Sequence, residues 1–399
     1  MPRNPSNLST DLRGVKDLTI DAITGITDIV ESLHKTISIV SRPGTPETCR
    51  TKGMTGMVYR NIRSVTALVG TGIDALLSRL TLDLGEKDLS PGREAVVSAL
   101  NGVLGNHLVA RRNPLAIPMQ FRRNGKPLNE QFLSDAIQRS NGRLAIMVHG
   151  ACMNDMQWNR QGHDHGVALA RDLGLAPVYV HYNTGLHISE NGRELTHLLE
   201  TLMAVSPQPT DIFIVAHSMG GLVSRSACHY GKLLDHTWMK LLRKLVFLGT
   251  PHHGSLLEKG GNWIDILLQI SPYSAPFSRL GKIRSCGITD LRYGNVLDDD
   301  WKGCDRFDFS RDQRMPVPLP EGVQCYSMAA TTGKETSMLG DHLIGDGLVT
   351  VNSALGRHKN TALNLSFPET RQWVGRNMNH LDLLNHPEVY EIMKKWLET

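Results

Sequence analysis

The sequence predicts an α/β fold, a mostly parallel central sheet flanked by helices, with an N-terminal helical module and a lid insertion. Three observations predict it. After residue 113, short apolar runs alternate with amphipathic helical patterns, which is typical of parallel strands covered on both faces. The residues before 110 carry helical spacing alone. A stretch of more than sixty residues without a strand signal follows one of the later strands.

The composition is that of an ordinary soluble globular protein. The chain has 399 residues, of which 40% are hydrophobic and 21% charged. Its formal charge of +4 is too small to favour nucleic acid as a partner. The N-terminus lacks the apolar core of a signal peptide, and no segment reaches the roughly 18 uninterrupted apolar residues of a membrane span. We therefore expect a cytoplasmic protein, and the sequence leaves its oligomeric state open.

The six cysteines show no close spacing of the kind that metal or redox motifs require. Cys152 and Cys228 lie in elements that we expect to be buried, so they are interpreted as small apolar fillers. Cys286 and Cys304 could pair if the protein were exported, and the sequence does not decide this point.

Residues 1–112 are predicted to form a helical module. Apolar residues recur at three- and four-residue spacing in three segments, which indicates three amphipathic helices. The third begins at Ser90-Pro91, because proline suits the first helical position. Packing on one another or on the next domain is the simpler interpretation. Contact with a lipid surface through residues 1–110 is the alternative, although the polar faces lack the dense Lys and Arg that anionic membranes favour.

Residues 113–399 are predicted to form the catalytic domain. It opens with a β-hairpin, because Asn124-Gly125 suits a positive-φ turn. Its further strands are expected at 144–148, 178–182, 212–215, 245–248, 323–329 and 362–367. Its helices are expected at 129–138, 166–172, 190–203, 220–230 and 387–397. Residues 255–320 lack a strand signal and are predicted to form a lid or cap over a pocket, whose apolar runs favour a hydrophobic substrate.

The stretch 211–221 predicts a nucleophile elbow. Ile212–Val215 is typical of a buried strand, Ser218 follows it at once, and a helical pattern begins directly afterwards. A serine hydroxyl is a weak nucleophile, so it must be presented within reach of a base and of amide donors. Ala216 and Gly220 leave room for the tight turn, although glycine is more usual at the first of these positions. An ordinary strand-to-helix turn that contains serine is the alternative.

The base and the acid are predicted from their positions along the chain. Asp346 lies between two glycines after a late strand, so its carboxylate is free to turn towards an imidazole, and Asp341 is a nearby rival. His380 lies in a loop before the last helix, and histidine takes and returns a proton near neutral pH. His386 directly precedes Pro387 at the helix start and is interpreted as structural.

Two backbone amides are predicted to form an oxyanion hole. One belongs to Ala151, in the turn after the strand that ends in His149-Gly150, and the other belongs to Met219, which follows the nucleophile. His149 is interpreted as a brace for this loop rather than as the base. This chemistry needs no cofactor and no metal.

From about residue 143 to residue 397 the chain resembles the α/β-hydrolase superfamily. Within it, the chain resembles the lipases and esterases of the GPI inositol-deacylase-like group. The matching stretches are 148–150, 182–185, 189–192, 216–221, 248–255, 345–349 and 380–384.

The resemblance implies an α/β-hydrolase fold and an acyl-enzyme mechanism. The expected function is hydrolysis of carboxylic esters by a cofactor-free serine esterase or lipase that acts on a hydrophobic acyl ester through Ser218, Asp346 and His380. The alternatives are an acyltransferase that uses the same residues, and a lipid- or granule-binding protein with a vestigial hydrolase domain.

Overall fold

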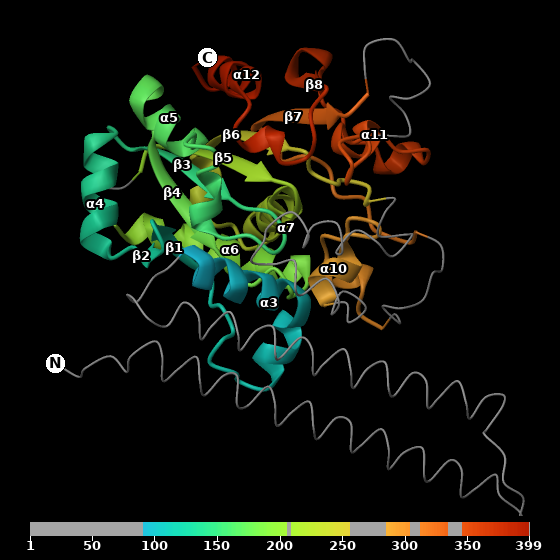
Figure 1. Ribbon diagram of the computed structural model, residues 1–399, viewed down its shortest axis with the longest axis horizontal. Helices are drawn as coiled ribbons and strands as arrows, with labels where there is room; N and C mark the ends of the chain where they lie inside the picture. Colours follow the sequence, from blue (N-terminus) through green and yellow to red (C-terminus); the bar gives the residue numbers. More distant parts are fainter. Residues whose placement is uncertain (1–90, 206–208, 256–284, 304–311, 334–344, 399) are drawn as a thin grey trace, which may run out of the picture.

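The computed structural model describes residues 91–205, 209–255, 285–303, 312–333 and 345–398 (Figure 1). The first two predicted helices, most of the predicted lid, Asp341 and Cys304 lie outside these ranges. Within these ranges the chain forms eight α-helices: α3 (Pro91–Ala110), α4 (Glu130–Arg139), α5 (His165–Leu173), α6 (Ile188–Thr201), α7 (Met219–Leu233), α10 (Cys286–Asp290), α11 (Val351–Ala354) and α12 (Pro387–Glu398).

One eight-stranded sheet organises this part of the chain. Its strand order is β2-β1-β4-β3-β5-β6-β7-β8. The β1–β2 and β1–β4 pairs are antiparallel, and all pairs from β4 to β8 are parallel. The strands are β1 (Gln120–Arg123), β2 (Lys126–Pro127), β3 (Arg143–Val148), β4 (Ala176–His181), β5 (Asp211–His217), β6 (Leu242–Leu248), β7 (Gln324–Thr331) and β8 (Gln372–Arg376). The predicted fold class and the predicted hairpin at Asn124-Gly125 are therefore confirmed.

Helices cover both faces of the sheet, so the central strands are apolar on both sides. In β3, Ile146 packs in the core that includes α3, α6 and α7, whereas Met147 packs in the core that includes α5 and α12. Figure 1 shows the same two layers, with α5 and α12 on one side of the sheet and α3 and α6 on the other. Because the strands from β4 to β8 are parallel, their carboxyl ends meet at one edge of the sheet, where ligand sites of such folds form.

The predicted strand at 362–367 is wrong. Thr361–Leu363 forms a short 3-10 helix, and the last strand is β8, which begins at Gln372. The alternation in this segment is real, since Leu365 and Phe367 are both buried. Their amides, however, donate to Gly356 O and Leu365 O rather than to a neighbouring strand. Alternating burial therefore misled the prediction, because it specifies which side chains face the core and not whether the backbone pairs.

Helix α3 shares the core of the sheet. Its Asn101 is fully buried and donates to Val97 O and Leu115 O, while its own Oδ1 accepts from Ile117 N. These bonds tie the helix to the segment that leads into β1. The predicted boundary after residue 112 stays a prediction because residues 1–90 are not described, but the third predicted helix packs as part of the sheet domain.

Two glycines bring α3 close to loops at the carboxyl edge of the sheet. A Cβ on Gly102 would lie 2.2 Å from Cys152 Sγ, and one on Gly105 would lie 1.9 Å from Asn183 Oδ1. Asn183 Nδ2 also donates to Gly105 O at 3.2 Å.

No helix in the described ranges is both long enough and apolar enough to cross a membrane.

Replacing Gly102 with alanine should destabilise the protein. Helix propensity alone would favour alanine by about 1 kcal/mol. The added methyl would meet Cys152 Sγ and Cα at 2.2 and 3.1 Å, and such overpacking costs about 1–3 kcal/mol. Urea unfolding of Gly102→Ala should therefore show a lower free energy of unfolding than the wild type. Val109→Ala, at a 44% exposed position of the same helix, is the control and should change it little. A more stable Gly102→Ala protein would contradict the close packing.

Candidate active site

Ser218 alone joins β5 to α7. Its backbone has φ 54° and ψ −123°, a conformation that non-glycine residues rarely adopt. The turn is held by a bond from Ser218 N to Leu248 O at 2.8 Å and by one from Gly221 N to Ser218 O at 3.0 Å. A Cβ on Gly220 would lie 2.4 Å from Val148 O, so the helix approaches β3 only because this residue has no side chain. The residue types of the predicted elbow thus coincide with a strained, tightly packed turn.

Asp346 and His380 form a buried pair. The distance from Asp346 Oδ2 to His380 Nδ1 is 2.6 Å, and each residue is 2% exposed. Asp346 Oδ1 accepts from the amides of Leu348 and Val349 at 2.9 and 2.7 Å, and the His380 amide donates to Asp346 O at 3.1 Å. The carboxylate is therefore fixed by two amides and accepts the Nδ1 proton, which leaves His380 Nε2 with its lone pair.

The structure places this pair next to the serine turn. His217, the residue before Ser218, donates from Nε2 to His380 O at 3.2 Å, and the two imidazole rings lie 4.7 Å apart. A Cβ on Gly249 would lie 3.0 Å from His380 Cε1, so β6 also ends against this ring. Ser218 Oγ and His380 Nε2 are both buried, and neither has a hydrogen-bond partner, so the two are not bonded to each other here. Such bonds are often long without substrate.

The loop after β3 lies against Ser218. A Cβ on Gly150 would lie 3.1 Å from Ser218 Cβ. The hydrogen bonds of this region use the amide of Cys152, which donates to Thr184 Oγ1 at 3.0 Å, and the amide of Ser218, but not those of Ala151 and Met219. Met219 stands in the first turn of α7, where amides lack intrahelical acceptors and the helix dipole favours negative charge. These two predicted donors therefore flank the serine.

His149 supports the loop that follows β3. Its Nδ1 donates to Gly150 O at 2.9 Å, and its ring stacks on Tyr182 with centroids 4.4 Å apart. The Tyr182 hydroxyl in turn donates to His149 O at 2.8 Å. Burial lowers the pKa of His149 to about 4, so its imidazole is neutral at pH 7. This geometry agrees with its interpretation as a brace.

The sequence did not single out two further histidines that hold the His380 loop. His217 lies inside the elbow motif, so its proximity to the serine could have drawn attention to it. His165 opens α5, donates from Nε2 to Leu383 O at 3.0 Å and contacts His163 through Nδ1 at 2.8 Å. Burial lowers the pKa of His165 to about 4, which keeps it neutral. No local pattern connects it to residue 383, more than two hundred positions away.

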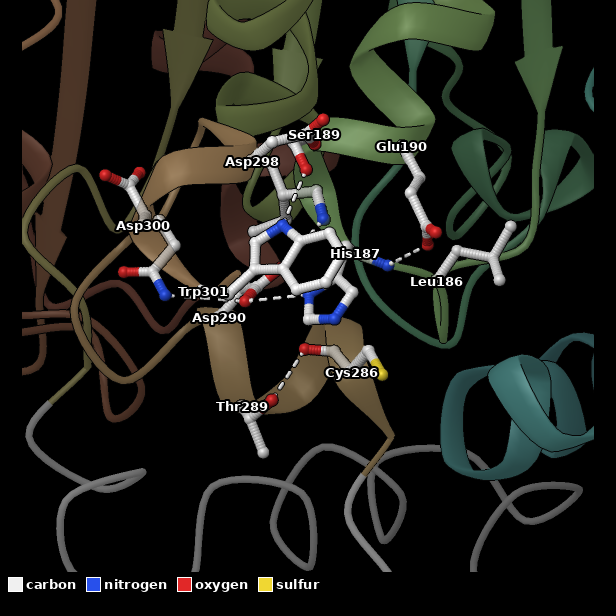
Figure 2. Close-up of polar contacts among 12 residues, drawn as sticks. Leu186, His187, Ser189, Glu190, Cys286, Thr289, Asp290, Asp298, Asp300 and Trp301 are labelled. Carbon is white, nitrogen blue, oxygen red and sulfur yellow. Dashed lines mark hydrogen bonds and ion pairs between the residues drawn. The ribbon is translucent and has the colours of Figure 1, made fainter. Parts of the chain in front are cut away.

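A polar cluster fixes α10 to the start of α6 (Figure 2). His187 Nδ1 lies 3.0 and 3.2 Å from the two carboxylate oxygens of Asp290, and Trp301 stacks on the imidazole with centroids 3.7 Å apart. The indole Nε1 donates to Ser189 Oγ at 2.9 Å. Burial opposes a charge on His187, but its bonds to Asp290 and Cys286 outweigh this effect and raise its pKa to about 10. Part of the predicted lid is thus anchored by an ion pair.

The described ranges hold no group of three or more His, Cys, Asp or Glu side chains arranged to bind a metal ion.

Comparison with known proteins gives distant similarities. The profile of a family described as Domain of unknown function (DUF7379) matches residues 116–279. No curated protein sequence matches the chain significantly. Among solved structures, the chain is similar to the mature lipase BlEst2 of Bacillus licheniformis, with 18% identity, coverage of 64% of this chain and 91% of that one, and a TM-score of 0.42.

Two other solved structures show similarity of the same kind. The lipase-esterase related protein of Clostridium acetobutylicum ATCC 824 has 13% identity, 64% and 94% coverage and a TM-score of 0.37. The phospholipase PlaB of Legionella pneumophila has 16% identity, 53% and 45% coverage and a TM-score of 0.35. Similarity this distant assigns no activity. The fold follows from the molecule itself: a mostly parallel sheet with helices on both faces and a serine turn between β5 and α7 is the arrangement of the α/β-hydrolase fold.

Glycine at position 218 should give a more stable protein than alanine at the same position. A residue held at this φ costs about 1–3 kcal/mol, which glycine avoids. The greater freedom of glycine in the unfolded chain offsets about 0.5–1 kcal/mol of that gain. Urea unfolding of Ser218→Gly and Ser218→Ala measures the difference. Ala227→Gly, in the regular part of α7, is the control and should lose at least about 1 kcal/mol. Equal stability of the two variants at position 218 would refute strain at the turn.

Replacing His187 with glutamine should reduce stability in a manner that depends on pH. The folded-state pKa of about 10 exceeds the ordinary value of 6.5, so the protonated imidazole contributes its stability fully below about pH 6.5 and loses it as pH rises through about 10. Urea unfolding of both proteins between about pH 6 and pH 10.5 should show their difference shrinking. Asp290→Asn should behave in the same way. A difference that stays constant with pH would rule out the ion pair.

Proposed function

We propose that the protein is a serine carboxylic ester hydrolase, an esterase or lipase that uses Ser218, His380 and Asp346. One observation carries the proposal: the 2.6 Å hydrogen bond that His380 Nδ1 donates to Asp346 lies beside a serine held at positive φ between β5 and α7. An aspartate in this position holds the imidazole in the tautomer that can accept a serine proton, and it stabilises the imidazolium that forms.

The proposed reaction proceeds through an acyl-enzyme. Ser218 Oγ attacks the ester carbonyl carbon while His380 Nε2 takes the serine proton. His380 then donates that proton to the oxygen of the departing alcohol. A water molecule, deprotonated by the same nitrogen, attacks the acyl-serine and releases the acid. Asp346 keeps its bond to Nδ1 through both halves.

The oxyanion is assigned to the amides of Ala151 and Met219. Both flank the serine, and neither takes part in the hydrogen bonds that the surrounding loops form. A pair of preorganised amides stabilises the charge that develops on the carbonyl oxygen, and losing one such donor costs roughly a hundred- to a thousand-fold in rate.

The proposed substrate class is an ester with an apolar acyl or alcohol portion. The serine turn is buried: Ser218 is 1% exposed and Met219 is fully buried, so a substrate reacts away from bulk water. Kinship with the GPI inositol-deacylase-like group rests on the sequence motifs and belongs to the same proposal. A cytoplasmic location and lipid contact through residues 1–110 stay predictions.

Replacing Ser218 with alanine should abolish turnover of p-nitrophenyl butyrate, with a fall of about a million-fold. It should also abolish labelling by a fluorophosphonate, because the nucleophile that forms the covalent bond is gone. Asp346→Asn should lower kcat by about ten-thousand-fold, since it favours the wrong tautomer of His380.

Ser226→Ala is the matched control for these assays. Ser226 is also buried on α7, but its hydroxyl donates to Val296 O, away from the turn. This variant should retain both turnover and labelling. Full labelling of Ser218→Ala would overturn the assignment of the nucleophile.

A further inference from the structure

A pocket of about 480 Å³ lies away from the serine turn, near the other edge of the sheet. It is formed by the later part of α7, by the 3-10 helix Thr237–Lys240 that precedes β6, and by residues 317–321, which lead into β7. These last two segments lie before the amino ends of their strands, whereas Ser218 follows the carboxyl end of β5. The volume is ordinary for a small-molecule site, and the pocket shares no residue with Ser218, Asp346 and His380.

Arg225 of α7 lines this pocket and is only 5% exposed. Its guanidinium meets uncharged groups: Nη2 donates to Val317 O at 2.7 Å, and Nη1 lies 3.5 Å from Nδ1 of His252, which burial keeps neutral by holding its pKa well below 6.5. Its Nε has no hydrogen-bond partner, and no carboxylate lies within ion-pair distance of it in the part of the chain that the structure describes.

A buried cation without a counter-ion is costly. Burial, and then the nearby charge of Arg314, lower the pKa of Arg225 to about 10, so the guanidinium is still charged at pH 7. The carboxylates of this region are engaged with other groups. Asp312 pairs with Arg314, and Asp300 accepts three backbone amides. An anion that enters the pocket would therefore balance a charge that the protein leaves unneutralised.

The exposed rim of the pocket carries charges of both signs. Lys232 and Lys240 face Asp235 and Glu321 there, and all four are exposed. Lys232 already pairs with Glu321 at 3.0 Å. The rim is thus nearly balanced by itself, and the uncompensated charge is the single one of Arg225. One inner cation favours a ligand with one negative charge rather than a phosphate dianion.

The remaining lining is largely apolar. Met239 and the run Val317-Pro318-Leu319-Pro320 supply most of it, and Val317 is buried. An apolar chain of a ligand would lose contact with water against these side chains. The pocket therefore combines one buried positive charge with apolar walls.

We propose that this pocket binds a monocarboxylate with an apolar chain, such as a medium-chain fatty acid. Its carboxylate faces the Arg225 guanidinium, and its chain lies against Met239 and residues 317–320. This binding is separate from the chemistry proposed for Ser218 and does not require it.

The first test titrates octanoate into the full-length protein by isothermal titration calorimetry, with no ester present. The wild type should bind one octanoate per chain at this pocket. Octanamide, which has the same chain without the charge, should bind at least about tenfold more weakly, because hydrogen bonds to charged groups are the stronger ones. Inorganic phosphate, which lacks the chain, should also bind more weakly than octanoate.

Arg225→Met should bind octanoate about ten- to a hundredfold more weakly than the wild type. Methionine removes the buried charge, a change that is often neutral or stabilising, and circular dichroism verifies the fold. Lys244→Met is the matched control, because Lys244 is a buried cation on β6 that donates to Trp396 O outside the pocket. It should leave octanoate binding unchanged. If Arg225→Met does not fold, Leu319→Trp fills the pocket from a half-buried position and should weaken binding instead.

A second measurement locates the ligand. In protein labelled with ¹³C at the methionine methyl groups, octanoate should shift the resonance of Met239, which lines the pocket. Met239→Leu assigns that resonance by its disappearance. The resonance of Met147, which is buried in the core on the other face of the sheet, should stay in place.

Three results would overturn the proposal. The first is equal octanoate affinity in the wild type and in folded Arg225→Met or, where that variant does not fold, Leu319→Trp, which is also the result expected if octanoate binds only at the serine turn. The second is octanamide or inorganic phosphate binding as tightly as octanoate. The third is octanoate binding without a shift of Met239. None of these readouts uses ester turnover, so they succeed or fail independently of the proposed hydrolase activity.

Discussion

The single-residue junction between β5 and α7 is the constraint on which the rest of the site depends. With Ser218 at a positive φ, the helix must begin immediately beside the ends of β3 and β6. Gly220 and Gly150 leave the space that this approach requires, and Gly249 leaves space for the ring of His380. The small residues around the turn are therefore consequences of one backbone conformation. A hydroxyl at the tip of such a turn is presented to the sheet edge without needing flexibility of its own.

Much of the fold could be predicted because burial on both faces gives parallel strands an unmistakable apolar run. Strands β3 to β7 and the helices α5, α6 and α7 follow this rule, and the prediction located them to within a few residues. The rule failed near the C-terminus, where β8 is an edge strand with only Gly375 buried. Its residues carry little apolar signal. In the segment before β8, Leu365 and Phe367 are buried although their backbone does not pair with a strand, so the alternating pattern resembles that of a strand.

The residues of the candidate site also divide into those that the sequence predicted and those that it could not predict. Ser218, Asp346 and His380 could be named because their order along the chain and their glycine-rich surroundings are local signals, and the structure brings Asp346 into contact with His380. His165, and the pairing of His187 with Asp290, carry no such signal. They act through backbone carbonyls and side chains that are distant in sequence, and their pKa values depend on burial that only the folded chain creates.

The way in which α3 is built into the molecule has a practical consequence for protein engineering. Helix α3 packs in the core of the sheet domain, and the side chain of its Asn101 is hydrogen-bonded through both its nitrogen and its oxygen. The helix also contacts the loops next to the serine turn. A shortened chain that starts at residue 113 would expose that core and leave the loops unsupported. Expression vectors meant to isolate the sheet domain must begin no later than Pro91, and deletions aimed at the preceding segment alone should end before it.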